Sequence, residues 1–311
     1  MATKVFIDGE HGTTGLQIQK RLAKRSDLEL LSLPHSDRYN INIRKDYLNQ
    51  TDIAILCLPD ETARETVHWL KKNKKIRIID SSTAHRVALN WIYGFPEMTA
   101  GQKERIQAAH YVTNPGCYPT GAISLIRPLR EACLLDSYYP ISINAISGYT
   151  GGGRKLIAQM ENQSRQDGVR ENYFIYALNL KHKHVPEIKI HGQISHTPIF
   201  VPSVGRFPQG MIVNIPLHRH LFTKSANYAD LREILVNHYD GQNIISVASQ
   251  EETDSLSKLN PECLAHKDGI KLFVFGNDSE GIFNLCAILD NLGKGAAAAA
   301  VQNLDLMLSG S

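Results

Sequence analysis

The chain has 311 residues, 42% of them hydrophobic and 21% charged, and its 34 basic and 31 acidic residues leave a formal net charge of +3. The two signs are mixed along the chain, so composition implies neither a nucleic-acid nor a membrane-surface partner, and we expect a small-molecule partner. The length favours two domains. Five scattered cysteines without a CxxC pair argue against a disulfide framework and a structural zinc site, and they indicate a reducing compartment. With no apolar run of about 20 residues and no room for a leader before the first strand, we expect a soluble, cytoplasmic protein.

The first predicted element is a short strand over residues 4–7, followed by a glycine turn and a helix. Glycines at 9, 12 and 15 match the GxxGxxG form of a dinucleotide fingerprint, in which phosphate binds at the helix N-terminus. The alternative is an ordinary glycine-rich turn between two core elements. The residues that we expect to hold a dinucleotide here are Gly9, Gly12, Thr13, Thr14 and Gly15.

Strands and helices continue to alternate, with strands predicted at 28–33, 52–58 and 76–80 and a helix at 61–73. This alternation predicts an α/β fold with a Rossmann-like, doubly wound parallel sheet. Ligands of such sheets bind beyond the carboxyl ends of the strands, although any residue there can also be an ordinary loop residue. The candidates for cofactor binding at these ends are Ser36, Arg38, Pro59 and Ser82.

The end of the second strand bears on the choice between NADP and NAD. Ser36 and Arg38 supply donors that suit the extra phosphate of NADP, whereas Asp37 at the same place suits the ribose of NAD. The donors on both sides of the acid favour NADP (NADPH), and Asp37 keeps NAD as the alternative.

A helix is predicted from Cys117 to about residue 132, directly after the helix-breaking sequence Asn114-Pro115-Gly116. At a helix N-terminus, backbone N–H groups and the helix dipole favour the thiolate and can bind an oxyanion formed beside the sulfur. Cys117 is therefore a candidate nucleophile. The alternative is a buried cysteine that packs as a small apolar side chain.

The rest of the chain has a different pattern. A strand at 141–147 leads through a glycine-rich loop, which includes Gly151 and can wrap a ligand, to Arg154 and an amphipathic segment at 156–164. Beyond it, one helix at 228–238 lies among short strands, which predicts an α+β domain with a mostly antiparallel sheet that carries substrate specificity. The strands are predicted at 191–195, 198–201, 211–217, 244–248, 272–275 and 282–289.

The last stretch, residues 291–308, is predicted to be an alanine-rich helix that returns to the first domain. Asn291 and Lys294 at its start are candidates to lie beside a phosphate or the nicotinamide. The predicted domains are residues 1–116, completed by 291–311, for dinucleotide binding, and residues 117–290 for catalysis and substrate.

Histidines, lysines and a carboxylate gather at residues 180–188. His182 is the candidate general acid/base for a cysteine nucleophile, and His184 and Glu187 are candidates to bind substrate or to orient a ring. The alternatives are a solvated charged loop, structural histidines or a pair of metal ligands. No third ligand of suitable spacing lies nearby, so no metal is expected.

Together these segments resemble the N-acetyl-γ-glutamyl-phosphate reductase family, in its shorter branch, within the semialdehyde dehydrogenase superfamily. The resemblance is carried by residues 9–15, 80–82 with Arg86, 93–97, 114–120, 147–154, 182–188 and 290–297. Residues 115–120 and the HxHxPE segment are specific to this family within the superfamily. The longer branch usually has Asp-Phe-Arg where this chain has Ala84-His85-Arg86.

The resemblance implies NADPH-dependent reduction of an acyl phosphate, N-acetyl-γ-glutamyl phosphate, to the semialdehyde in arginine biosynthesis. We also expect the protein to form a homo-oligomer. It assigns Cys117 as the nucleophile that forms a thioester, His182 as the general acid/base, and Arg86 or Arg154 as the partner of the substrate's phosphate or carboxylate. Three alternatives remain: an aspartate-semialdehyde dehydrogenase type of reductase, a cysteine hydrolase, and a non-catalytic dinucleotide sensor.

Overall fold

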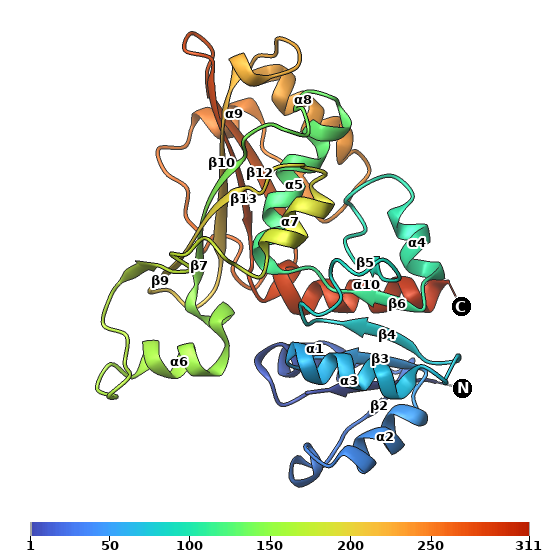
Figure 1. Cartoon of the computed structure of the whole chain (residues 1–311). Coiled ribbons are helices and arrows are strands. Elements are labelled where there is room, and N and C mark those ends of the chain that lie inside the picture. The colour runs from blue at the N-terminus through green and yellow to red at the C-terminus, as the bar shows by residue number, and fades with distance from the viewer. Residues whose placement is uncertain (1, 311) are drawn as a thin grey trace. The chain divides into compact units, whose positions relative to one another are not determined.

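The computed structural model describes residues 2–310 and divides the chain into two compact units (Figure 1). Unit 1 combines the chain up to Pro96 with Ala100–Gly116 and the chain from Ala296, and unit 2 combines Glu97–Thr99 with Cys117–Gly295. The chain therefore passes from unit 1 to unit 2 at Cys117. Within residues 2–310, no helix has the length and apolar character needed to cross a membrane.

Unit 1 contains a six-stranded sheet in the order β2-β1-β3-β4-β6-β5. Every strand pair in it is parallel, which confirms the predicted Rossmann-like sheet. The strand order reverses between β1 and β3, and ligands of such sheets bind at this point. The strands are β1 (Thr3–Asp8), β2 (Leu28–Leu31), β3 (Ile53–Leu56), β4 (Arg77–Asp80), β5 (Ile92–Tyr93) and β6 (Tyr111–Thr113).

Helices cover both faces of this sheet, because the buried β1 strand sends alternate side chains to two cores. Val5 and Ile7 join a core with α1, α4 and α10, and Phe6 joins one with α2 and α3. The C-terminal helix thus belongs to unit 1. The helices are α1 (Thr13–Leu22), α2 (Ile41–Asn49), α3 (Asp60–Leu70), α4 (Gln102–Ala108) and α10 (Ala298–Ser309).

Unit 2 contains a seven-stranded sheet in the order β11-β12-β13-β10-β7-β9-β8. Four of its six strand pairs are antiparallel, as predicted, while β11 with β12 and β7 with β9 are parallel. The strands are β7 (Ser142–Gly148), β8 (Tyr173–Ile175), β9 (Ile199–Gly205), β10 (Met211–His218), β11 (Ile245–Val247), β12 (Ile270–Asn277) and β13 (Ile282–Leu289).

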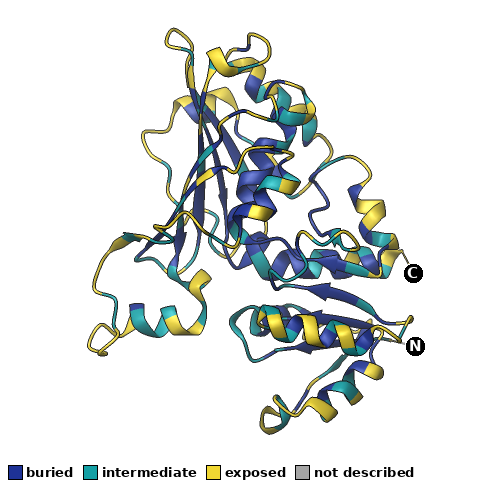
Figure 2. Ribbon diagram, in the orientation of Figure 1, coloured by how far each residue is buried: buried dark blue, intermediate teal, exposed yellow. Residues whose placement is uncertain are grey.

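Helix α5 (Cys117–Glu131) packs on the β10 and β13 strands of this sheet and is almost entirely buried (Figure 2). Gly121 allows this close approach, since a Cβ there would lie 2.7 Å from Cγ2 of Val213. The other helices of unit 2 are α6 (Gly153–Glu161), α7 (Val185–His191), α8 (Tyr228–His238) and α9 (Gln250–Asp254), and α7 and α8 pack against α5.

The predicted strand at 191–195 is wrong, because His191 is the last residue of helix α7. Pro186 near the start of α7, the acidic Glu187 in its first turn and basic residues in its last turn all favour a helix here. The chain leaves the helix at Gly192 and turns at Gln193, whose φ is +55°.

Candidate functional site

The glycine turn after β1 has the close backbone packing that a dinucleotide fingerprint requires. Gly9 has φ of +93°, and a Cβ on Gly15 would lie 2.3 Å from the carbonyl oxygen of Gly9. Helix α1 begins after Gly12 with no side chain capping its first N–H groups. These uncapped N–H groups and the open backbone fit a pyrophosphate. Thr13 and Thr14 form the first turn of α1 at this place.

The other residues predicted at strand ends lie in loops of unit 1. Ser36 is exposed in the short 3-10 turn η1 (His35–Asp37), and Arg38 follows directly. Pro59 is the N-cap of α3, and Ser82 donates from both its N–H and its hydroxyl to Asp80. The Asp80 carboxylate thereby fixes the loop after β4.

Cys117 is the only one of the five cysteines that begins a helix, and it is half-buried. Burial raises the pKa of Cys57 and of Cys286 to about 12, so both thiols stay protonated at neutral pH. Cys133 and Cys263 are exposed. The position of Cys117 is the one at which helix N–H groups favour a thiolate.

Close packing fixes the start of α5. A Cβ on Gly295 would lie 2.9 Å from Cβ of Cys117, so the backbone at Gly295 packs directly on the cysteine. The next residue, Tyr118, donates its hydroxyl to the carbonyl oxygen of Ser203 at 2.9 Å. The cysteine is thus held between two segments of unit 2.

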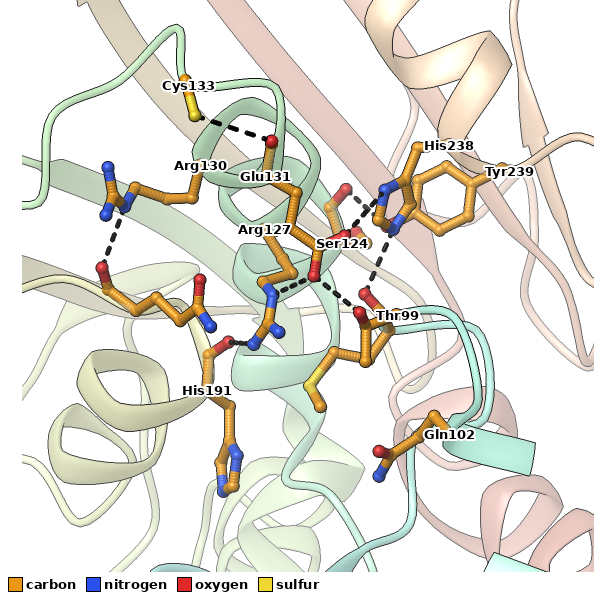
Figure 3. A network of polar contacts seen from close by, with 12 residues as sticks. Thr99, Gln102, Ser124, Arg127, Arg130, Glu131, Cys133, His191, His238 and Tyr239 are labelled. Carbon is orange, nitrogen blue, oxygen red and sulfur yellow. Dashed lines mark hydrogen bonds and ion pairs between the residues drawn. The ribbon is translucent and has the colours of Figure 1, made fainter. Parts of the chain in front are cut away.

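A polar network holds the other end of α5 (Figure 3). The Glu131 carboxylate accepts hydrogen bonds from Oγ1 of Thr99 and from Nε of Arg127, both at 2.6 Å. Nδ1 of His238, on α8, lies 3.6 Å from the same carboxylate, and its Nε2 donates to the carbonyl oxygen of Met98. The helix that presents Cys117 is therefore anchored to Thr99 and to His238 of α8.

His182 has both ring nitrogens engaged. Its Nδ1 accepts the backbone N–H of His184 at 3.1 Å, so the proton of the neutral ring lies on Nε2, which is 3.3 Å from the hydroxyl oxygen of Tyr176. Burial, helped by the charge of Lys183, lowers the pKa of His182 to about 4. The ring is therefore neutral at physiological pH.

Tyr176, which no sequence motif marks, lies beside His182, with its hydroxyl oxygen 3.3 Å from Nε2 of that ring. Burial raises the pKa of Tyr176 to about 12, and the negative charge of a Cys117 thiolate contributes to this rise. The same thiolate raises the pKa of Tyr118, whose ring lies 6.0 Å from that of His182. Tyr176 and Tyr118 therefore both lie beside His182, and the charge of Cys117 raises the pKa of both phenols.

The predicted substrate-binding residues lie in both units. His184 and Glu187 are buried at the start of α7, with the His184 ring 4.7 Å from that of His182, whereas Arg154 is exposed in the first turn of α6. Arg86 is buried in unit 1, where its guanidinium donates to the carbonyl oxygens of Asn114 and Ser81. Arg86 thus supports the segment that precedes Cys117 in the chain.

Asn291 and Lys294 make internal contacts within unit 2. Asn291 accepts the N–H of Gly210 at 2.8 Å and donates to the hydroxyl of Thr150, beside Gly151 in the glycine loop. Nζ of Lys294 lies 2.7 Å from Oε2 of Glu97, and both side chains are 2% exposed. The cofactor contacts of Gly151, Asn291 and Lys294 stay predictions. Among residues 2–310, no group of three or more His, Cys, Asp or Glu side chains could hold a metal ion.

Comparison with known families identifies both parts of the chain. Residues 4–108 match the NAD-binding domain of semialdehyde dehydrogenase, and residues 117–291 match the semialdehyde dehydrogenase dimerisation domain. The chain therefore belongs to the semialdehyde dehydrogenase family. Its relatives within that family include the N-acetyl-gamma-glutamyl-phosphate reductases of Brucella suis, 58% identical, and Brucella anthropi, 57% identical, each over 99% of both chains.

Solved structures share the fold at much lower identity. Aspartate semialdehyde dehydrogenase II from Vibrio cholerae, complexed with ASA, is 16% identical with a TM-score of 0.76, and the match covers 99% of each chain. Aspartate semialdehyde dehydrogenase with NADP from Candida albicans is 13% identical with a TM-score of 0.67, covering 100% of this chain and 99% of that chain. These likenesses concern the fold alone.

Proposed function

We propose that this chain is an oxidoreductase that reduces N-acetyl-γ-glutamyl phosphate to N-acetylglutamate 5-semialdehyde and phosphate, a step of arginine biosynthesis in the cytoplasm. The observation that carries the proposal is the 58% identity, over 99% of both chains, to an N-acetyl-gamma-glutamyl-phosphate reductase. The half-buried Cys117 at a helix start, in the same unit as a neutral histidine, supports the chemistry.

The reaction proceeds in two stages on Cys117. The thiolate sulfur attacks the acyl carbon, the carbon–oxygen bond to phosphate breaks, and a thioester remains on the enzyme. NADPH held at the glycine turn of residues 9–15 would supply the hydride that reduces this thioester. The resulting thiohemiacetal then breaks its carbon–sulfur bond, which releases the aldehyde and returns the thiolate. The first N–H groups of α5 stabilise the oxyanion that forms at each stage.

His182 is the general acid/base of this scheme. With Nδ1 accepting the N–H of His184, the neutral ring carries its proton on Nε2, and this is the atom proposed to donate to the substrate oxygen and to recover the proton afterwards. Nε2 of His182 contacts the hydroxyl of Tyr176, and the pKa of this phenol is raised by the charge on Cys117. Arg86 or Arg154 is assigned to the substrate's phosphate or carboxylate, and His184 and Glu187 to its remaining polar groups.

The preferred cofactor in this proposal is NADPH. The match to an NAD-binding domain and the open turn at Gly9 to Gly15 support a nicotinamide dinucleotide. Ser36 and Arg38, after β2, support the form with the 2′-phosphate. A KM for NADPH well below the KM for NADH would agree with this preference, and the reverse order would contradict it.

The protein is proposed to act as a homo-oligomer. The dimerisation-domain match covers the region that contains β8 and β9, and three large apolar side chains on these strands are exposed: Tyr173 by 52%, Ile175 by 43% and Ile199 by 54%. We expect a second copy of the chain to cover these three side chains. Light scattering should show a dimer or a larger species. The double variant Ile175→Lys, Ile199→Lys should dissociate it, and an unchanged mass in this variant would exclude these side chains from the subunit interface.

The test of function is the reverse reaction, with purified protein, phosphate and NADP added to either aldehyde. N-acetylglutamate semialdehyde should be oxidised much faster than aspartate semialdehyde, and the opposite preference would make the chain an aspartate-type enzyme. Cys117→Ser should bind NADPH normally and lose turnover. Turnover without any nicotinamide would indicate a hydrolase, and binding of NADPH without turnover of either aldehyde would indicate a sensor.

A further inference from the structure

Three basic side chains from two loops gather where the glycine turn of unit 1 meets the end of β2. His11 comes from the turn, and His35 and Arg38 come from the segment after β2. The rings of His11 and His35 meet edge to face, with centroids 4.7 Å apart. Nη1 of Arg38 lies 2.9 Å from Nδ1 of His35, and the guanidinium lies over the ring of Tyr39. We call His11, His35 and Arg38 the basic cluster.

The contact with Arg38 fixes the hydrogen-bonding role of His35. A guanidinium can only donate, so Nδ1 of His35 is the acceptor, and the proton of the neutral ring lies on Nε2. The same Arg38 nitrogen also donates to the carbonyl oxygen of His35 at 2.6 Å. His35 is exposed, and its ring lies beside the permanent positive charge of Arg38.

Glu10 fastens the two loops of the basic cluster together. Its buried carboxylate accepts the N–H of Leu33 and the hydroxyl of Ser32, both just after β2, and the side-chain amide of Gln19 on α1. Nε2 of His11 lies 3.9 Å from Oε1 of Glu10. The carboxylate of Glu10 thus ties the glycine turn, in which His11 is the next residue, to the end of β2 through neutral donors.

We propose that His11 and His35, together with Arg38, recognise the 2′-phosphate of NADP and so determine the preference for NADP over NAD. This inference rests on the proposed NADPH-dependent function. When pyrophosphate binds at the N-terminus of α1, the adenosine ribose lies at the end of β2, where the basic cluster is located. Imidazole and guanidinium groups form charge-assisted hydrogen bonds with a phosphate monoester. The cluster offsets the negative charge of Asp37 in the same segment.

NADPH and NADH differ only in this phosphate. A variant that has lost recognition of the phosphate should therefore bind NADPH less tightly and NADH unchanged, whereas a damaged structure should weaken the binding of both. The variants are His11→Gln, His35→Gln and their combination, and the control is His68→Gln, an exposed histidine on α3 of the same unit. Isothermal titration measures binding of NADPH, NADH, adenosine 2′,5′-bisphosphate and adenosine 5′-monophosphate to the 311-residue chain. NADH binding also reports whether each variant has folded.

The double variant should lose about tenfold or more in affinity for NADPH and for the 2′,5′-bisphosphate, with NADH and the 5′-monophosphate within about twofold. His68→Gln should match the parent protein. Equal losses for NADPH and NADH, or no loss for either, would overturn the role of the two histidines. If the parent protein binds neither dinucleotide, the proposed function itself fails; if it prefers NADPH and the double variant keeps that preference, only this inference fails.

Discussion

The charge state of His182 is the most specific electrostatic prediction of the structure. An ordinary imidazole of pKa about 6.5 is about three-quarters protonated at pH 6. Because burial and Lys183 lower the pKa of His182 to about 4, only about one ring in a hundred should be protonated at that pH. The unfolded chain binds this proton more readily, so the contribution of His182 to folding stability is complete above pH about 6.5 and is lost as the pH falls toward 4.

Lys183→Gln removes the smaller of the two causes and leaves burial in place. The pKa of His182 should rise in this variant yet stay below 6.5. Lys181→Gln is the matched control, since it removes a neighbouring exposed lysine that does not contribute to the shift. Histidine-selective NMR titration measures the pKa, and His182→Gln assigns the signal. A parent pKa near 6.5, or equal effects of the two lysine substitutions, would refute the reasoning.

Three further predictions test the packing around the site. Gly15→Ala should weaken NADPH binding by about tenfold or more in a fluorescence titration, because its Cβ would lie 2.3 Å from the backbone of the turn, and an unchanged affinity would contradict this packing. Gly121→Ala should lower the free energy of unfolding, measured in urea, by about 1 to 2 kcal/mol, since the clash with Val213 outweighs the better helix propensity of alanine. Adding Val213→Ala should relieve this loss. If the effects of the two substitutions on the free energy of unfolding simply add, the contact between the two residues is contradicted. Cys57, whose pKa is raised to about 12, should react with iodoacetamide at least about a hundredfold more slowly than the exposed Cys133, and equal rates in peptide mapping would show that its thiol is not buried.

Elements with a regular pattern and clear end signals were predictable from the sequence. Helix α8 begins and ends at the predicted residues, Tyr228 and His238, and its start is set by the capping box of Asn227 with Asp230. Helix α5 begins at the predicted Cys117 because Pro115 and Gly116 end what precedes it. In both cases the residues that set the boundary are local.

Elements and contacts that depend on distant partners were not predictable. Strands β5 and β6 have two and three residues, too few for a pattern to show, and they exist through pairing within the parallel sheet. The pairing of Lys294 with Glu97 joins residues 197 positions apart. Tyr176 lies in no motif, and only the folded chain places its hydroxyl beside His182.

The most direct test of the central claim is the mass of the enzyme after mixing with N-acetyl-γ-glutamyl phosphate in the absence of NADPH. Intact-protein mass spectrometry should show one added N-acetylglutamyl group, peptide mapping should place it on Cys117, and NADPH should then discharge it as the semialdehyde. An active enzyme that forms no such adduct, or that carries it on another residue, would contradict a thioester at Cys117.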